Sequence, residues 1–310
     1  MIHHFIINPA AGSYDRTREY ADAIEKACRE HGIDCRISVS AAPGDCTRIA
    51  AEAVQSGQPV RLYACGGDGT LNEVVAGAAG FDNAAVTVYS GGSGNDFTKL
   101  FSDPDAFRDI DRLLDSEEVT FDLIRCNEDL CLNICSVGLD ARIGTDVANY
   151  KRIPFFSGFR AYAVSALINT VRGVSAHYRV EINGQVFDGE QTMICICNGR
   201  YYGGGFNPVP DADPTDGYLD VLLVKGVTRR KVLTVIGKYK AGNYDKLPDI
   251  IQRFRTKQVT ILCDEESAVN LDGELRMAKK IEIGVADKTV RFFYPRGLTW
   301  RVPEKALTQK

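Results

Sequence analysis

Short apolar runs and longer amphipathic stretches alternate through the first third of the chain. The apolar runs predict β-strands, and stretches with apolar residues three or four positions apart predict helices. The predicted strands are residues 5–7, 35–39, 60–65 and 86–89, and the predicted helices are residues 17–31, 45–56 and 71–79. A glycine follows each predicted helix, as is common after a helix C-terminus. This alternation predicts a parallel sheet with helices on both faces.

The pattern changes after Phe121, where short β-rich segments replace the alternation of strands and helices. They are residues 121–126, 130–136, 177–182, 192–197, 218–224, 258–262 and 280–285. Asn183-Gly184 and residues 286–288 have the composition of hairpin turns. Many short strands with few helices favour a sandwich-like second domain. We therefore expect an α/β domain over residues 1–121 and a mainly antiparallel β-sandwich domain over residues 122–294, with residues 295–310 packing back on the first domain.

The composition is that of a soluble globular protein. Of 310 residues, 45% are apolar and 25% are charged, and the length favours two domains. A net charge of −4 argues against a general nucleic-acid binder, which would carry a broadly basic face. The ten cysteines are scattered and form no CxxC pair, so we expect reduced, structural thiols and a cytosolic setting.

The chain contains no segment that predicts a signal peptide or a membrane span. The first apolar run enters a turn at Asn8-Pro9, as a first strand would. Residues 153–171 are the most apolar candidate for a span, but they include Arg160 and Asn169. This stretch therefore predicts an amphipathic helix and not a membrane span.

The segment Gly66–Glu73 directly follows the predicted strand at residues 60–65 and opens the next predicted helix. Its glycines let backbone N–H groups approach an anion, and the start of the helix presents its positive end, so the segment predicts a phosphate cradle. Asp68 inside that cradle is a poor phosphate ligand by itself. It fits if a divalent cation or a reacting hydroxyl lies between its carboxylate and the phosphates.

Four further segments contain residues that can carry chemistry. They are Asn8–Gly12, Ser90–Phe97, Asp213–Asp220 and Leu271–Glu274. Each of them alone is also a common turn or loop pattern. Their occurrence together with Gly66–Glu73 favours a functional site.

Taken together, these segments resemble the diacylglycerol-kinase catalytic-domain family, which includes soluble bacterial lipid kinases, sphingosine kinases and ceramide kinases. The matching motifs are Gly66-Gly67-Asp68-Gly69-Thr70-Leu71-Asn72-Glu73, Gly92-Ser93-Gly94-Asn95-Asp96-Phe97, Asp216-Gly217-Tyr218-Leu219-Asp220 and Asp272-Gly273-Glu274. The resemblance spans nearly the whole chain and is greatest to the bacterial branch. It implies an α/β domain that binds ATP and a β-sandwich domain that receives a lipid in the cleft between the domains.

The resemblance also implies a set of site residues. Those that would bind ATP are Asn8, Pro9, Gly12, Ser40, Gly66, Gly67, Asp68, Gly69, Thr70, Leu71, Asn72, Ser93, Asn95 and Asp96. Asp68 and Asp96 would organise Mg²⁺ and the phosphates. A structural Mg²⁺ would be held by the carboxylate of Asp216 with the carbonyls of Asp213 and Tyr218.

The chain departs from the family pattern at two positions. Ser13 stands where some bacterial members have a lysine that supports the acidic network, and Ser93-Gly94 replaces the usual Gly-Thr before Asn95-Asp96. Neither departure removes a carboxylate from the predicted site.

The chemistry of phosphoryl transfer supports the same residues. Transfer needs positioning and charge neutralisation, and a lipid hydroxyl needs a carboxylate that accepts its proton. The resemblance assigns catalytic carboxylates to Asp272 and Glu274, with Asp68 beside the phosphates. Asp272 is a candidate base, and Glu274, two residues on in an extended segment, would face the same side. Which of the two accepts the proton is open at this stage.

Residues 225–257 contain ten basic and two acidic side chains, although the whole chain is acidic. Such a run is either a solvated helix surface or a region that docks onto an anionic bilayer. The second interpretation suits a cytoplasmic enzyme that contacts the membrane only during turnover. The lipid acceptor, diacylglycerol or a similar lipid, is not identified by the sequence, and a homodimer is one option for the oligomeric state.

Two other functions, NAD kinase and a nucleotide-binding regulator without catalysis, fit part of this pattern. NAD kinases share a Gly-Gly-Asp-Gly phosphate motif and a two-domain plan, but they carry a different segment where this chain has Gly92–Phe97. A nucleotide-binding regulator without catalysis would not need Asp68, Asp96, Asp216, Asp272 and Glu274 together. An ATP-dependent, Mg²⁺-assisted lipid kinase is therefore the favoured function.

Overall fold

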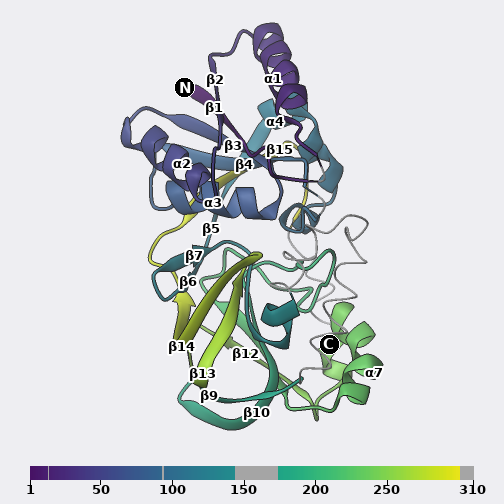
Figure 1. Ribbon diagram of the computed structural model, residues 1–310. Coiled ribbons are helices and arrows are strands. Elements are labelled where there is room, and N and C mark those ends of the chain that lie inside the picture. The colour runs from purple at the N-terminus through teal and green to yellow at the C-terminus, as the bar shows by residue number, and fades with distance from the viewer. Residues whose placement is uncertain (13, 93, 144–173, 301–310) are drawn as a thin grey trace. The chain divides into compact units, whose positions relative to one another are not determined.

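The computed structural model describes residues 1–12, 14–92, 94–143 and 174–300, which form two compact units (Figure 1). The first unit combines Met1–Asp122 with the chain from Asp287 onward, and the second unit is Leu123–Ala286. The predicted helix at residues 153–171 lies outside the described residues, as do Ser13 and Ser93.

The first unit is an α/β domain, as the sequence predicts. Its elements are β1 (Ile2–Ile7), α1 (Thr17–His31), β2 (Cys35–Val39), α2 (Asp45–Gln55), β3 (Val60–Gly66), α3 (Asp68–Ala78), β4 (Ala84–Ser90), η1 (Phe97–Leu100), η2 (Pro104–Arg108), α4 (Ile110–Leu114), β5 (Ser116–Phe121) and β15 (Val290–Pro295). The described strands form one sheet in the order β2-β1-β3-β4-β15-β5. Strands β2 to β15 in this order run parallel, and β5 pairs antiparallel with β15.

Helices cover both faces of this sheet. Helix α1 packs beside α4 on one face, and α2 packs beside α3 on the other (Figure 1). Strands β1 and β3 are therefore buried along almost their whole length, which explains their nearly continuous apolar sequence. The carboxyl ends of β1, β3 and β4 lie next to one another at one edge of the sheet because these strands are parallel neighbours.

Strand β15 returns the chain to the first sheet and completes its core. Phe292 packs against the rings of Phe97, Phe121 and Phe101, at centroid distances of 5.3, 5.6 and 5.9 Å. The expectation that residues up to 294 belong to the second domain is wrong for this strand, as is the hairpin predicted at residues 286–288. A hairpin requires β15 to pair with β14, but β15 pairs with β4 and β5.

The second unit is an antiparallel β-domain. Its elements are β6 (Ile124–Cys126), β7 (Asp129–Cys131), β8 (Ile134–Gly138), β9 (Ala176–Ile182), β10 (Gln185–Cys197), β11 (Leu219–Lys225), α7 (Arg229–Lys240), η3 (Tyr244–Lys246), β12 (Ile251–Thr256), β13 (Gln258–Leu271) and β14 (Glu274–Val285). The described strands follow the order β12-β11-β10-β8-β13-β14-β6-β7, and β9 pairs with both β10 and β13.

Burial alternates along β9, where Tyr178, Val180 and Ile182 face the core. The predicted turn at Asn183-Gly184 is confirmed: it joins β9 to β10, and both residues have positive φ, 49° and 73°.

The predicted strand at residues 130–136 is interrupted. Strand β7 ends at Cys131 and β8 begins at Ile134, so Leu132 and Asn133 belong to neither strand. Their backbone N–H groups donate to the carboxylate of Asp272 and make no strand ladder. A contact with a residue about 140 positions away therefore breaks an apolar run that local pattern predicts as one strand.

All ten cysteines are free thiols, and all except Cys35 are buried. Within the described residues, the helices are too short or too polar to cross a bilayer.

Candidate functional site

Two glycine pairs in the first unit pack backbone against backbone. The carbonyl of Gly66, at the end of β3, accepts the N–H groups of Gly91 and Gly92 at 2.8 and 3.1 Å. A Cβ atom on Gly92 would lie 2.5 Å from Cα of Gly67, closer than any side chain allows. Gly67 and Gly92 are therefore required for the close contact between the loops after β3 and β4, in addition to the phosphate-binding role that the sequence predicts for Gly67.

The loop after β1 joins the same place. The side-chain amide of Asn8 donates to Oγ1 of Thr70 at 3.0 Å, and the backbone N–H of Asn8 donates to the carbonyl of Cys65. Gly12 has φ +89°, and a Cβ atom on it would lie 3.2 Å from the carbonyl oxygen of Gly91. The predicted ATP-binding residues after β1, β3 and β4 thus lie together at one edge of the sheet.

Helix α3 opens at the centre of this group of loops. Its first residue is Asp68, and Gly67 is its N-cap in an extended conformation. The first four N–H groups of a helix have no partner within the helix and carry its positive end, so they suit an anion. Thr70, Leu71 and Asn72 are buried in α3, so they form the packed base of the loop.

Asp68 and Asp96 converge on Gly94. One oxygen of Asp68, Oδ1, accepts the backbone N–H of Phe97 at 3.2 Å, and Oδ1 of Asp96 pairs with Nζ of Lys99. The other oxygen of each carboxylate, Oδ2, lies within 3.6 Å of the point where a side chain on Gly94 would begin. Two carboxylate oxygens directed at one point form a donor set that Mg²⁺ accepts.

Asn95 shapes the turn between these carboxylates. It adopts the left-handed conformation, with φ 46°, and its side-chain amide donates to the carbonyl of Gly92. Ser40, at the end of β2, is buried, and its backbone N–H donates to the carbonyl of Ile7. Both predicted positions therefore belong to the same group of loops.

In the second unit, three backbone amides bind the carboxylate of Asp272. Its Oδ2 accepts the N–H groups of Leu132 and Asn133 at 3.0 and 2.9 Å, and its Oδ1 accepts that of Ile134 at 2.8 Å. Burial raises the pKa of Asp272, and the amide donors oppose that shift. Asp272 thus anchors the connection between β7 and β8.

Glu274 has different surroundings. It is the first residue of β14, its side chain is 33% exposed, and it pairs with Arg276 at 3.1 Å. Arg276 in turn pairs with Asp129 on β7. Asp272 and Gly273 form the turn between β13 and β14, with φ 50° and 100°. The expectation that Asp272 and Glu274 share one face of an extended segment is therefore not met.

The residues predicted for a structural Mg²⁺ already have partners within the protein. Oδ2 of Asp216 pairs with Nη2 of Arg255 at 2.6 Å, and its Oδ1 accepts the N–H of Tyr218. Oδ1 of Asp213 accepts both the N–H and the hydroxyl of Thr215. Among the described residues, no three His, Cys, Asp or Glu side chains gather as metal ligands. A metal ion at Asp216 would have to compete with the guanidinium of Arg255, and binding of Mg²⁺ by the Asp216 carboxylate with the carbonyls of Asp213 and Tyr218 stays a prediction.

Several residues that support these carboxylates lie outside the sequence motifs. Lys99 stands three residues after Asp96 in a helical turn, a spacing that predicts an ion pair. Arg276 stands two residues after Glu274 on one strand, a spacing that places both side chains on one face. No local signal points to the contact of Arg255 with Asp216, since these residues lie 39 positions apart.

Comparisons with known families match almost the whole chain. The family described as diacylglycerol kinase catalytic domain matches residues 3–126. The family described as YegS C-terminal NAD kinase beta sandwich-like domain matches residues 133–293. Each of the two matches lies largely within one unit of the structure.

Individual proteins give the same result. A protein of Staphylococcus epidermidis named "Putative lipid kinase" is 28% identical over 74% of this chain and 75% of its own length. A Staphylococcus aureus protein of the same name is 26% identical over the same shares. A crystal structure titled as that of a "putative diacylglycerol kinase" from Bacillus anthracis shares the fold. Its TM-score is 0.73 at 22% identity, and the alignment covers 95% of this chain and 97% of that one.

Proposed function

Because the chain belongs to the diacylglycerol-kinase catalytic-domain family, we propose that it transfers the γ-phosphoryl group of ATP to the hydroxyl of a lipid. The convergence of Asp68 and Asp96 on Gly94, beside the N-terminus of α3, is the observation that carries this proposal. Phosphoryl transfer depends on positioned phosphates and neutralised charge, and this arrangement provides donors for both.

In this proposal the first unit binds the nucleotide. The N–H groups at the start of α3 bind phosphate oxygens, and Asp68 and Asp96 hold Mg²⁺, which neutralises charge on the transferred group when bound. Asn8 fixes Thr70 through its side-chain amide and so holds the loops after β1 and β3 together. Lys99 and the N–H of Phe97 orient the two carboxylates toward Gly94.

The second unit supplies the base in this proposal, and we assign that role to Glu274. Both oxygens of Asp272 accept backbone N–H groups that hold the connection between β7 and β8, so a substrate hydroxyl would have to compete with these donors. Glu274 is partly exposed, and its ion pair with Arg276 orients its side chain. A diacylglycerol or a similar lipid alcohol is the acceptor that the family favours.

The test is transfer of label from γ-labelled ATP into a total lipid extract, with NAD as a parallel acceptor. We expect label in a lipid fraction, and a loss of at least about 10²-fold for Asp68→Asn and Glu274→Gln. Glu25→Gln is the matched control, because Glu25 is an exposed carboxylate on α1. Label in NADP and not in lipid would identify an NAD kinase, and no transfer to either would favour a nucleotide-binding regulator.

We also propose that α7 docks onto an anionic membrane surface. Arg229, Arg230 and Lys231 form its first turn, where the positive end of the helix dipole disfavours basic residues. On the same helix Leu233 is 72% exposed and Ile236 is 42% exposed. Exposed apolar side chains among basic ones stabilise neither the helix nor the core, but they suit the interface of an anionic bilayer.

Sedimentation with lipid vesicles tests this surface. The variant Leu233→Ser/Ile236→Ser and the variant Arg229→Gln/Arg230→Gln/Lys231→Gln should each bind anionic vesicles at least about tenfold more weakly than the parent chain. Lys279→Gln/Lys280→Gln is the control, because these exposed lysines lie on β14. Unchanged binding of both α7 variants would contradict the role of the helix, whatever the outcome of the transfer assay.

A further inference from the structure

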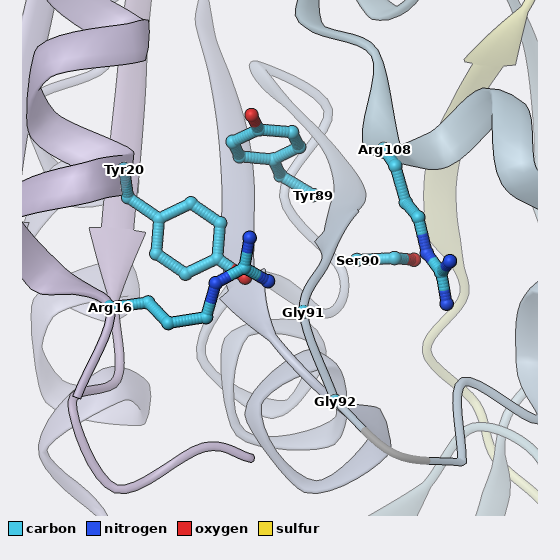
Figure 2. Close-up of a pocket in the computed structure, with 7 residues that line it drawn as sticks. All are labelled: Arg16, Tyr20, Tyr89, Ser90, Gly91, Gly92 and Arg108. Carbon is cyan, nitrogen blue, oxygen red and sulfur yellow. The ribbon is translucent and has the colours of Figure 1, made fainter. Parts of the chain in front are cut away.

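The first unit contains a cavity of about 310 Å³ that the proposed transfer reaction does not use. It lies between the start of α1, the end of β4 and the end of η2 (Figure 2). Its walls are formed by Arg16, Tyr20, Tyr89, Ser90, Gly91, Gly92 and Arg108. Two of these side chains are cationic, and none of the described residues in its lining is acidic.

The two arginines approach the cavity from different elements. Arg16 precedes α1, and its guanidinium lies 5.0 Å from the ring centroid of Tyr20. Arg108 ends η2, and the hydroxyl of Ser90 points toward its guanidinium (Figure 2). Arg16 pairs with Glu19 and Arg108 with Asp105, but both partners are exposed carboxylates outside the lining. The pair of Arg108 with Asp105 is exposed and therefore weak, whereas Arg16 is held by Glu19 through two hydrogen bonds, so Arg108 is the cation more available to a ligand in the cavity.

Two hydroxyl groups in the cavity wall have no hydrogen-bond partner among the residues that the structure describes. They are Oη of Tyr20 and Oγ of Ser90, in residues that are only 4% and 3% exposed. A buried hydroxyl without a partner costs about 1–3 kcal/mol, so native proteins seldom keep two together. Burial raises the pKa of Tyr20 and of Tyr89 to about 12, and both phenols therefore remain protonated at neutral pH. The hydroxyl groups of Tyr20 and Ser90 can donate hydrogen bonds, and a ligand that accepts them would satisfy both.

We propose that the cavity binds a phosphate monoester or inorganic phosphate. Two guanidinium groups and two hydroxyl donors, with no acidic side chain in the lining, match the charge and the hydrogen-bonding capacity of a phosphate group. The volume exceeds what inorganic phosphate alone fills, so an esterified phosphate with a small organic group uses the cavity better.

The cavity adjoins the proposed nucleotide site, because Gly91 and Gly92 line the cavity and Gly92 also packs against Gly67. A Cβ atom on Gly91 would collide with the phenol oxygen of Tyr20 in the cavity wall, whereas one on Gly92 would collide with Gly67 at the base of α3. The loop after β4 thus contributes to the cavity wall through Gly91 and Gly92 and to the predicted phosphate cradle through Gly92. A phosphate in the cavity would stabilise the loop that packs against Gly67.

Calorimetric titration of the full chain with inorganic phosphate, and with glycerol 3-phosphate as the headgroup of a phosphorylated lipid, tests the proposal. We expect saturable binding that Arg108→Gln and Ser90→Ala each weaken at least about tenfold. Arg18→Gln is the control, because Arg18 lies on α1 with a side chain 96% exposed and outside the cavity. Tighter binding of the ester would identify a lipid headgroup as the source, and equal binding would identify free phosphate.

A second measurement separates this site from the nucleotide site. The phosphate titration is repeated with a saturating non-hydrolysable ATP analogue, and we expect the phosphate affinity to persist. Displacement of phosphate by the analogue, or equal affinity in Arg108→Gln, Ser90→Ala and the parent chain, would overturn the proposal. Absence of binding by either phosphate compound would overturn it as well. In the absence of phosphate, Ser90→Ala should not lower the melting temperature, because it removes a hydroxyl that has no partner.

Discussion

Asp272 and Glu274 lie two residues apart in a single motif, yet their side chains have different partners. Three backbone amides hold the carboxylate of Asp272, and one guanidinium orients that of Glu274. The first arrangement stabilises a turn and a strand connection, and the second leaves a partly exposed carboxylate beside a cation. The two residues should therefore respond differently to substitution.

We predict that Asp272→Asn lowers the free energy of unfolding by about 2–4 kcal/mol, because an amide cannot accept all three N–H groups. Glu274→Gln should change that free energy by less than about 0.5 kcal/mol and reduce phosphoryl transfer by about 10²-fold or more. Urea unfolding followed by circular dichroism, together with the transfer assay, measures both effects. Equal stability of the two variants would remove the structural role assigned to Asp272.

Gly94 gives a second prediction at this scale. A side chain there would begin 2.8 Å from Oδ2 of Asp68, so Gly94→Ala must push that carboxylate away from the point it shares with Asp96. Because displacement of a catalytic group by about 1 Å can cost about 10²-fold, we expect a loss of that size in kcat/KM. Gly237→Ala in α7 is the control, since nothing lies within 4 Å of its added methyl group. A Gly94→Ala variant with normal turnover would show that Asp68 does not act from this position.

The sequence predicts some of this residue-scale detail and not the rest. The motif Gly66–Thr70 predicts a phosphate cradle because a strand, glycines and a helix start follow one another in the chain. The close contact of Gly92 with Gly67 and the three amides on Asp272 join residues far apart in sequence. Neither contact produces a local sequence pattern. The motifs therefore place all of these residues in the site, and they do not distinguish residues that pack from residues that bind or react.

For secondary-structure elements, the sequence predicts the ends of some elements but not their neighbours in the sheet. Helix α1 and strand β2 have the predicted ends, because a glycine at φ +63° stops the helix and apolar residues define the strand. The sequence of β15 also predicts a strand, but it does not predict that this strand lies between β4 and β5. That place depends on an aromatic cluster assembled from distant segments, which hydrophobic periodicity does not encode.

This aromatic cluster gives a prediction for β15. The ring of Phe292 is fully buried among Phe97, Phe101, Phe107 and Phe121. Phe292→Ala should therefore lower the free energy of unfolding by about 3–5 kcal/mol. ATP binding should weaken as well, because the N–H of Phe97 orients Asp68.

Phe81→Ala is the matched control for this change, since Phe81 lies in the same unit with 41% of its surface exposed. Urea unfolding and a nucleotide titration should show little change for it. A loss below about 1 kcal/mol in Phe292→Ala would mean that β15 does not complete the core of the first unit.

At the scale of the whole molecule, the chain forms two units with separate cores, and each has its own titratable groups. The first unit buries His3 and His4 on β1, whereas His31 and His177 are exposed. Burial, together with the positive charge of Arg61, lowers the pKa of His3 from 6.5 to about 4, and burial with Arg36 lowers that of His4 equally. Asp140, buried in the second unit, has a pKa raised to about 6 by burial. The two units should therefore respond to acid in opposite senses.

The direction of the histidine effect follows from proton binding. Between pH 6.5 and about 4 the unfolded chain protonates these two histidines and the folded chain does not, so lowering the pH favours unfolding. Above pH 6.5 both states are neutral and the effect vanishes. From pH 7 to pH 5 each ring should cost the first unit about 2 kcal/mol of stability. For Asp140 the folded state binds the extra proton, so acid in the same range stabilises the second unit.

The single tryptophan of the chain makes this difference measurable. Trp300 is buried in the first unit against Phe121, so its fluorescence reports the unfolding of that unit, whereas circular dichroism follows both. Between pH 7 and pH 5 the urea midpoint seen by fluorescence should fall, and the dichroism transition should broaden or split. His4→Gln should remove about half of the fluorescence shift. A fluorescence midpoint that is the same at both pH values would show that neither buried histidine resists protonation, and a shift shared equally by both probes would show that the units unfold as one.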